Sequence, residues 1–410
     1  MRSALGRTVV LLSGGALATA GWGAIFPFLY ADIADLRHLG AAVAALTFTA
    51  FAVGSILAAP LAGTLADRVD PVRVAVLARV GLAASTWLLD QTDRPALIWL
   101  YAAGLGASLA LAQPAIQVVL LALAPAERRR DVFAWQFIAL NLAAAGGAAA
   151  AGACVDLTHP GGMRPVYLIG TLAALASAGV VQLAGRGFHR ESATIEAAPQ
   201  PASYRSVLAA RPVRWLLGIA LLITLACYAQ YDAGLPAYVL AATDVHPAML
   251  GSAVALNALL VAVLTGPVVA ATRGRHGTTL LAACAAIWVL CWLVFGLPLL
   301  VGGHDGGFVL LGFAVMSVGE TMMAPILSPL AAELAPAGAA GRTLAAVTGA
   351  TTVATAIGPV LASGLLGLHH PGGFILMQVG ACLAAGAAAL RLRRLVVPAP
   401  VLNRGELLPM

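Results

Sequence analysis

The chain has 410 residues, of which 61% are hydrophobic and only 10% are charged, and its mean hydropathy is +0.93. A soluble domain carries roughly 25% charged residues, so this sequence has too little charge to cover a water-facing globule. A bilayer core about 30 Å thick needs about 20 apolar residues per helical crossing, which allows about ten to twelve crossings and no sizeable soluble domain. The composition predicts an integral membrane protein and argues against soluble catalysis, secretion and nucleic-acid binding.

Charge-free stretches bounded by Arg, Asp, Gly or Pro predict twelve membrane-spanning helices. In chain order they lie near residues 9–30, 41–62, 74–90, 96–123, 132–154, 166–184, 213–236, 248–270, 278–299, 307–331, 343–366 and 372–390. The third contains Arg79 and the tenth contains Glu320, so these two spans also depend on the spacing of their neighbours.

The arginines set the orientation of these spans. All 23 basic residues are Arg, which we interpret as a signature of genomic base composition, in a protein that we expect to be bacterial. With the N-terminus inside, 20 of them fall on cytoplasmic segments, Arg79 counted among these, and only Arg37, Arg94 and Arg164 fall outside. Because positive residues are retained on the cytoplasmic side, this split supports an even number of spans in the inner or plasma membrane, with both termini cytoplasmic.

The chain divides into two similar halves. The longest polar segment, residues 185–212, predicts a cytoplasmic linker between a six-helix bundle at 1–184 and another at 213–390, with a cytoplasmic tail at 391–410. Pro114 and Pro125 recur at an offset of 211 as Pro325 and Pro336. Internal similarity of this kind is typical of transporters built from two repeats.

The most specific motif lies between the second and third spans, where Gly63, Asp67, Arg68 and Arg73 follow one another in a short loop. A Gly there permits close helix packing, and a carboxylate at the end of a bundle can bind the N-terminus of a neighbouring helix or pair with Arg. The loop resembles the signature loop of the major facilitator superfamily. The resemblance implies an all-α fold with twelve transmembrane helices in two pseudo-symmetric six-helix bundles, and a switch between two conformations at this loop. Asp70 replaces the second glycine of the motif and, with Pro71, predicts the start of the third span.

A second motif lies in the eleventh span, where Gly349, Gly358 and Pro359 resemble the glycine and proline motif that antiporters of the superfamily show in span five. Span five itself has Asn141 but no Pro, and span four lacks the basic residue of the family. Close helix packing explains the small residues of the eleventh span equally well.

Two acidic residues lie within otherwise apolar spans, Glu320 near the middle of the tenth and Asp232 in the outer third of the seventh. An ionisable group in the membrane is costly unless it faces a cavity or a partner. A carboxylate in such a cavity can exchange protons or hold a cationic substrate, but rarely both at once, which is a mechanism for exchange. Together with Asp67, these acids resemble those of the LmrP group of multidrug/proton antiporters. That resemblance implies proton and substrate binding at Glu320 and Asp232, with Asn141 where the group has a further acid.

Other polar and aromatic residues are candidates for lining a central cavity, although hydrogen bonding between helices or anchoring at the interface would explain them too. They are Trp22, Phe26, Gln113, Gln117, Tyr228, Gln230, Tyr231 and Asn257.

These observations predict a secondary active transporter that exports lipophilic small molecules, cationic ones among them, by proton antiport and alternating access. An importer or facilitator of a sugar or organic acid, or a membrane sensor without transport, remains the alternative. We expect no enzymatic activity, no metal and no cofactor, since the five cysteines lie in apolar stretches and no catalytic or nucleotide-binding pattern is present. The expected partners of this monomeric chain are its substrate, protons and membrane lipids, and not nucleic acid.

Overall fold

The computed structural model describes residues 2–156, 159, 161–186, 203–301, 303–367 and 370–396, with side chains except those of 2–5, 41, 232, 233, 247 and 248. These parts of the chain form helices, turns and loops, without a strand. Twelve of the helices in them are long and apolar enough to cross a membrane, which confirms the predicted count and the all-α class.

The first half consists of six long helices and three short helical segments. Its elements are α1 (Arg2–Ile25), α2 (Leu29–Ala31), the π-helix η1 (Asp32–Leu36), α3 (Gly40–Arg68), α4 (Pro71–Asp90), α5 (Pro95–Leu123), the 3₁₀ turn η2 (Ala126–Arg128), α6 (Arg129–Cys154) and α7 (Arg164–Gly185).

The second half follows a short helix, α8 (Tyr204–Ala209). Its elements are α9 (Arg211–Ile223), the π-helices η4 (Thr224–Tyr228) and η5 (Gln230–Gly234), α10 (Leu235–Ala242), α11 (Pro247–Ala271), α12 (Gly277–Gly296), the 3₁₀ turn η6 (Leu297–Leu299), α13 (Asp305–Glu333), α14 (Ala340–Gly367) and α15 (Pro371–Val396).

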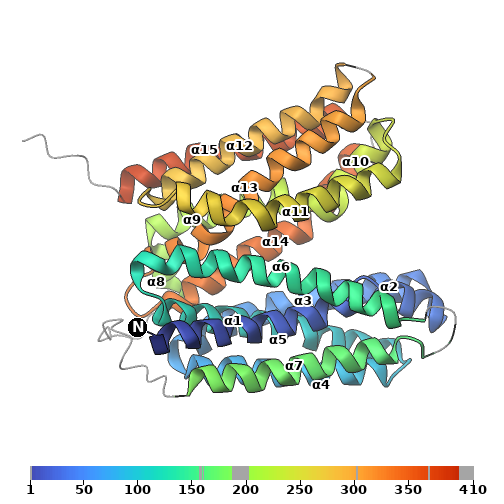
Figure 1. Ribbon diagram of the computed structural model, residues 1–410, viewed down its shortest axis with the longest axis vertical. Helices are drawn as coiled ribbons and strands as arrows, with labels where there is room; N and C mark the ends of the chain where they lie inside the picture. The colour runs from blue at the N-terminus through green and yellow to red at the C-terminus, as the bar shows by residue number, and fades with distance from the viewer. Residues whose placement is uncertain are drawn as a thin grey trace, which may run out of the picture.

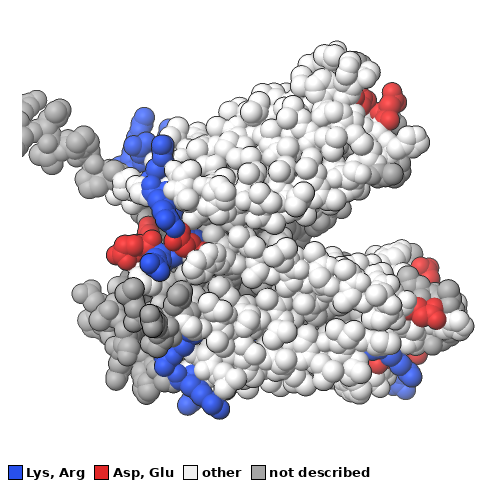
Figure 2. Space-filling view, viewed as in Figure 1, with Lys and Arg blue, Asp and Glu red and all other residues white. Residues whose placement is uncertain are grey.

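The two halves form two bundles that lie side by side (Figure 1). In the first, α1 packs against α6 and α7, and α5 packs against α3 and α4. In the second, α12 packs against α13 and α15, and α11 packs against α13. Contact between the bundles is made by α3 and α5 with α14, and by α6 with α11 and α13. On the face that Figure 2 shows, most of the arginines gather at one end, which we call the inner end because it is predicted to face the cytoplasm.

Several predicted boundaries shift by a few residues. The first helix ends at Ile25 and not near residue 30, because Pro27 cannot continue a regular helix. The last helix runs to Val396, so the predicted tail begins inside it and lies outside the described residues from 397 onward. Of the predicted linker, residues 187–202 lie outside the described residues, and part of the remainder forms α8.

The start of the third span is as predicted. The Asp70 side chain accepts a hydrogen bond of 3.0 Å from the backbone N–H of Val72, and Pro71 occupies the first turn of α4. An Asp at the N-cap satisfies one of the free N–H groups of a helix start, and Pro is well tolerated there because its missing N–H would be free anyway.

The two bundles are packed in different ways. The first brings helix backbones together at glycines: a Cβ on Gly147 of α6 would meet the carbonyl oxygen of Ala20, and one on Gly106 of α5 would meet that of Phe51. Small residues allow this close approach, which drives helix association in a membrane. The second bundle is filled instead by large buried aromatic side chains, which are Tyr238, Trp288, Trp292, Phe295, Phe313 and Phe374.

A buried polar cluster holds the outer end of the first bundle together. Tyr167 donates a hydrogen bond of 2.7 Å to the carboxylate of Asp32, which also forms an ion pair of 2.7 Å with Arg37. The guanidinium of Arg37 donates further hydrogen bonds to the carbonyl oxygens of Leu89 and Thr92. These contacts join η1, α4 and α7, and each charged group in the cluster has its partners.

We expect Tyr167→Phe to lower the free energy of unfolding by about 1–3 kcal/mol, because it removes one hydrogen bond from a buried carboxylate. Thermal unfolding of the purified protein in detergent measures this, with Tyr30→Phe as the control because Tyr30 is exposed. Equal stability of the two variants would contradict a structural role for the cluster.

Candidate functional site

At the inner end, Asp67 joins the two bundles. One carboxylate oxygen accepts a hydrogen bond of 2.6 Å from the backbone N–H of Gly341, and the other accepts one of 3.0 Å from that of Arg342. The Arg342 guanidinium adds an ion pair of 2.8 Å, and both side chains are buried. Since Gly341 and Arg342 begin α14, the carboxylate of one half caps and neutralises the positive helix end of the other.

This contact brings α3 and α14 very close together. A Cβ on Gly63 would lie 2.7 Å from the Cα of Arg342, and one on Gly341 would lie 2.8 Å from the Cβ of Ala66. Tyr204 of α8 covers the junction, because its hydroxyl donates a hydrogen bond of 3.2 Å to the carbonyl oxygen of Ala59. Burial raises the pKa of Tyr204 to about 12, so this hydroxyl keeps its proton at physiological pH. Gly63 thus lies where only glycine fits, at the closed inner end.

A second contact between the halves lies at the same end. Arg273, just after α11, forms an ion pair of 2.9 Å with Asp131 in the first turn of α6. Arg130 also donates a hydrogen bond of 3.4 Å to the carbonyl oxygen of Thr272. The Arg273 side chain is 68% exposed, so this pair is far more accessible to water than the pair of Asp67 and Arg342.

The two contacts are related by the internal repeat with their charges exchanged. The offset of 211 that relates Pro114 to Pro325 also relates Asp131 to Arg342, each of which lies in the first turn of its helix. The partner is an acid at the end of α3 in one contact and a base after α11 in the other. The segment after α11 thus contributes a base, Arg273, where the end of α3 contributes an acid, Asp67. Together we call the pairs Asp67–Arg342 and Asp131–Arg273 the inner contacts.

The two arginines of the signature loop lie elsewhere. Arg68 is exposed, and Arg73 lies 3.6 Å from Asp70 on its own helix, with 78% of its side chain exposed. Neither takes part in the inner contacts, so a role in the conformational switch stays a prediction for both, and retention on the positive side explains them equally well.

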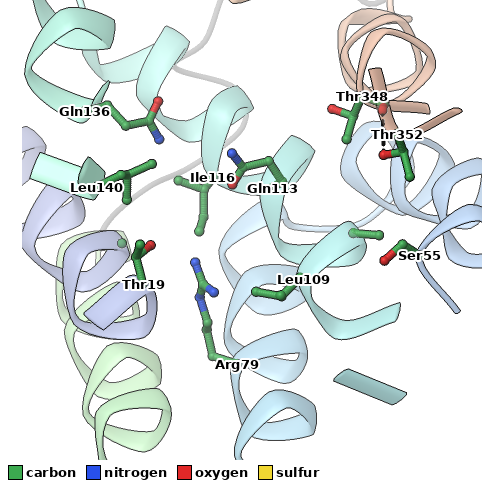
Figure 3. A pocket seen from close by; sticks show the side chains of 12 residues that line it. Thr19, Ser55, Arg79, Leu109, Gln113, Ile116, Gln136, Leu140, Thr348 and Thr352 are labelled. Carbon is green, nitrogen blue, oxygen red and sulfur yellow. Dashed lines mark hydrogen bonds between the residues drawn. The ribbon is translucent and has the colours of Figure 1, made fainter. Parts of the chain in front are cut away.

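A cavity of about 290 Å³ lies between the bundles, beyond the inner contacts. It is lined by side chains of α1, α3, α4, α5 and α6 from the first half and of α14 from the second (Figure 3). The twelve lining residues are Gly15, Thr19, Ser55, Arg79, Leu109, Ala110, Gln113, Ile116, Gln136, Leu140, Thr348 and Thr352.

Arg79 is the charged residue of this lining. Its side chain extends from α4 into the space between Thr19, Ile116 and Leu109 (Figure 3). Only 5% of the residue is exposed, and the buried Nε has no hydrogen-bond partner. Counting Arg79 among the cytoplasmic arginines was therefore wrong, because α4 begins at Pro71 and carries it about 12 Å into the span at 1.5 Å per residue.

The halves separate toward the opposite, outer end, where a groove opens between them (Figure 2). The inner end is closed by the inner contacts. The structure is thus an outward-open arrangement of a two-bundle protein.

Glu320 lies in the second bundle, on α13, with 6% of its surface exposed. The amide nitrogen of Asn257 on α11 lies 3.4 Å from one of its carboxylate oxygens and 2.9 Å from the hydroxyl of Ser317. Neither Glu320 nor Asn257 is among the residues that line the central cavity. The predicted intramembrane position of Glu320 is therefore correct, but its surroundings are polar groups of its own bundle.

Asp232 lies on the π-helix η5, and its side chain lies outside the described residues. The backbone is nevertheless informative, because η4 and η5 replace regular α-helix over much of the seventh span. π-Helices insert an extra residue into a helix and occur frequently at functional positions. A role for Asp232 stays a prediction.

Of the amides expected at the cavity, Gln113 does line it. Gln230 is fully buried and donates hydrogen bonds to the carbonyl oxygens of Leu225 and Gly358, so it joins η5 to α14. Gln117 is buried outside the lining, and Asn141 is exposed and donates to the carbonyl oxygen of Phe137 on its own helix. Helix packing, the alternative explanation, therefore accounts for Gln230, and nothing places Gln117 or Asn141 at the cavity.

The aromatic candidates fall into two groups. Tyr228 packs against Trp288 and Tyr231 against Phe313, so both belong to the aromatic filling of the second bundle. Trp22 stacks on Phe51 with ring centroids 4.9 Å apart, at the outer side of the cavity.

Phe26 extends the second group, since its ring meets that of Phe48 edge to face at 5.3 Å.

The Gly and Pro motif of α14 is only partly involved in close helix packing. A Cβ on Gly358 would meet the Cβ of Ala229, and Pro359 follows inside the helix, but a Cβ on Gly349 would meet nothing within 4 Å.

Comparison with known proteins decides the family. The sequence profile of the Major Facilitator Superfamily matches residues 11–313, which is most of the chain. The chain belongs to the Major Facilitator Superfamily. It is accordingly a multi-pass membrane transporter of a small-molecule substrate and not an enzyme. No curated protein sequence is similar enough to count as a match.

Solved structures of other transporters share the fold. A bacterial homologue of the iron transporter ferroportin in an outward-facing state has a TM-score of 0.77 at 18% identity, over 94% of this chain and 99% of that one. The human organic anion transporter MFSD10 (TETRAN) has a TM-score of 0.74 at 17% identity, over 93% and 98%. FucP in its outward conformation has 0.73 at 15%, over 95% and 99%. At these identities the likeness establishes the fold alone.

Sequence reasoning missed two features of this superfamily member. Arg79 carried a usable signal, because a charged residue inside an apolar span is expensive and calls for a functional explanation. For the Asp131–Arg273 pair, the repeat offset gave a partial signal, because it makes Asp131 the equivalent of Arg342 at the start of a helix, but it does not identify Arg273 as the partner. By contrast, Gln136, Thr19, Ser55 and the two threonines of α14 resemble any other small or polar residue of a membrane helix.

We expect Asp67→Asn to open the inner end, because it leaves the buried Arg342 without its counter-ion, at a cost of about 3–5 kcal/mol. Opening can be measured as labelling of Thr348→Cys by a membrane-impermeant maleimide applied to the inner side, with the exposed Cys154 replaced by Ala. Labelling should become at least about tenfold faster than in the parent protein. Glu127→Gln, which removes an exposed acid, is the control. Unchanged labelling in Asp67→Asn would contradict the assignment.

The Asp131–Arg273 pair should act in the same direction but weakly, because exposed ion pairs contribute about 0.2–1 kcal/mol. In the same labelling assay, Asp131→Arg and Arg273→Asp should each speed labelling at most a few-fold, and the double variant should restore the parent rate. If the increases in labelling rate of the two single variants add in the double variant, the two residues do not act as a pair.

Proposed function

We propose that this member of the superfamily is a secondary active transporter that exports lipophilic small molecules in exchange for protons, by alternating access. The observation that supports it most directly is the arrangement of the inner end. Two charged contacts between the bundles close that end, a cavity lies between the bundles, and a groove between them opens at the opposite end (Figure 2). A closed inner end held by a few discrete contacts is suited to a two-state rocking motion.

We further propose that each bundle, at 1–184 and 213–390, moves as a unit. Contacts inside the first bundle are backbone-close packing at glycines, and those inside the second are interlocked aromatic rings. Both kinds resist gradual deformation. The contacts between the bundles at the inner end are instead hydrogen bonds and ion pairs, which can be broken as a set and re-formed.

Proton coupling is assigned to Glu320. An ionised carboxylate is costly at this depth, so a carboxyl group held there by the neutral amide of Asn257 is suited to take up and release a proton. In this outward-open arrangement Glu320 is buried and does not line the cavity, so the proposal requires a proton path that reaches it from outside in one state and from the cell interior in the other. Asp232 is the second candidate for this role.

The preference for cations that the acids suggested is not favoured by the cavity, since its twelve lining residues include Arg79 and no carboxylate. The same arginine favours the alternative of a small organic acid as cargo, either exported or imported. The direction of net flux separates these two possibilities, and no described feature favours a sensor without transport.

We expect Glu320→Gln to lose proton-coupled transport by at least about tenfold while retaining exchange of substrate for substrate, because a neutral amide cannot carry a proton. The measurement uses proteoliposomes with an internal pH-sensitive dye and a panel of fluorescent lipophilic cations and carboxylates. Glu333→Gln is the matched control, since Glu333 lies on the same helix but is exposed at its inner end. Parent-level proton flux in both Glu320→Gln and Asp232→Asn would contradict proton antiport through these acids.

A further inference from the structure

The guanidinium of Arg79 has no counter-ion within the described residues. Its Nε is buried without a hydrogen-bond partner, and no described carboxylate forms an ion pair with it. A guanidinium cannot lose its proton under physiological conditions, so the group stays charged in an apolar surrounding. Such a group lowers the stability of the protein, so its presence calls for a functional explanation, and intramembrane charges of this kind mark substrate or ion pathways.

The neighbours of Arg79 in the cavity are donors rather than acids. Gln113 of α5 and Gln136 of α6 line the same space, and neither side chain forms a hydrogen bond with another described residue. Across the cavity, the hydroxyls of Thr348 and Thr352 donate to carbonyl oxygens of their own helix, at 3.1 and 2.9 Å. One fixed positive charge and two free amides thus converge from the first bundle, which is a set of donors suited to a carboxylate.

An aromatic surface continues from this polar site toward the outer end. Gly15 and Thr19 of the cavity and Trp22 follow one another on one face of α1 at spacings of four and three. Phe26, four residues after Trp22 and just past the end of the helix, continues this face, since its backbone N–H still donates to the carbonyl oxygen of Trp22. Seven residues separate Thr19 from Phe26, or about 10 Å along the axis.

On α3, Ser55 of the cavity is preceded on one face by Phe51 and Phe48. The rings of the two helices meet, with Trp22 stacked on Phe51 and Phe26 edge-on to Phe48. Phe26 is 43% exposed even though it belongs to this cluster. A positive polar site and an apolar ring surface therefore lie one after the other along the same two helices.

We propose that the cavity binds an amphipathic organic anion, whose carboxylate pairs with Arg79 and whose ring or alkyl body lies toward Trp22, Phe26, Phe48 and Phe51. The inference rests on the proposed transport function and names the class of its cargo. A cavity of about 290 Å³ is at the small end of ligand sites, so the anion should be compact, of the size of a two-ring acid.

The test uses the purified full-length protein and three probes of one shape: 2-naphthoate, 2-naphthylmethanol and 2-naphthylmethylammonium. Binding is measured by equilibrium dialysis and by the shift in unfolding temperature. We expect 2-naphthoate to bind at least about tenfold more tightly than the alcohol, and the ammonium to bind most weakly, since only the anion gains from the buried guanidinium.

Arg79→Gln should lose at least about tenfold in affinity for 2-naphthoate and leave the alcohol unchanged, whereas Arg79→Lys should retain part of the preference for the anion. Arg393→Gln removes one positive charge from the exposed end of α15 and should bind all three probes like the parent. Without ligand, Arg79→Gln should unfold at the same or a higher temperature than the parent, because it removes a buried charge that has no partner. A purely structural role for Arg79 predicts the opposite shift.

Tightest binding of the ammonium, or unchanged 2-naphthoate affinity in Arg79→Gln, would overturn the anion site. The outcome is separable from the transport proposal. If the proteoliposome assay shows coupled export of cationic dyes and 2-naphthoate does not bind, transport stands and the anion site fails. If 2-naphthoate binds through Arg79 but no probe crosses the membrane, the anion site stands and the transport proposal fails.

Discussion

The contact between the Asp67 carboxylate and the first turn of α14 is the interaction on which the observed arrangement depends. It satisfies two backbone N–H groups and the Arg342 guanidinium at once, in a junction so tight that a side chain at Gly63 would not fit. While it is formed, the inner end is closed and the groove between the bundles opens only outward. Because hydrogen bonds and ion pairs are lost as a set when two helix ends separate, such a contact favours two discrete states over a continuum.

The internal repeat supplies a second contact at the same end but with inverted charge and greater exposure. Asp131 and Arg342 occupy equivalent first turns, yet one helix start carries an acid and the other a base. The two contacts therefore differ in strength: the buried pair carries most of the closure, and the exposed pair, screened by water, contributes little. The internal repeat determines where the two contacts lie, and burial determines how strongly each ion pair holds the inner end closed.

The two bundles also divide the polar groups within the membrane. The first is packed through glycines and presents Arg79 and two amides to the cavity, whereas the second is filled with aromatic rings and holds Glu320 beside Asn257. In the mechanism that we propose, separation of a positive site from an acidic one would let substrate and proton occupy different places and act on each other through the motion of the bundles. Direct competition for one carboxylate, which the sequence suggested, is then unnecessary.

The sequence by itself determined the membrane class, the twelve spans, the Arg-rich inner end, the capped start at Asp70 and Pro71, and the signature loop. These follow from local quantities: apolar length, charge position and the chemistry of a helix start. Only the tertiary structure decided that Asp67 binds the start of α14, that Gln230 joins helices and does not line the cavity, and that Arg79 faces the centre of the protein. The reason is physical: apolar residues on every face of a membrane helix leave no periodic signal of which side meets a neighbour, lipid or a cavity, and that side is set by packing between helices far apart in the chain.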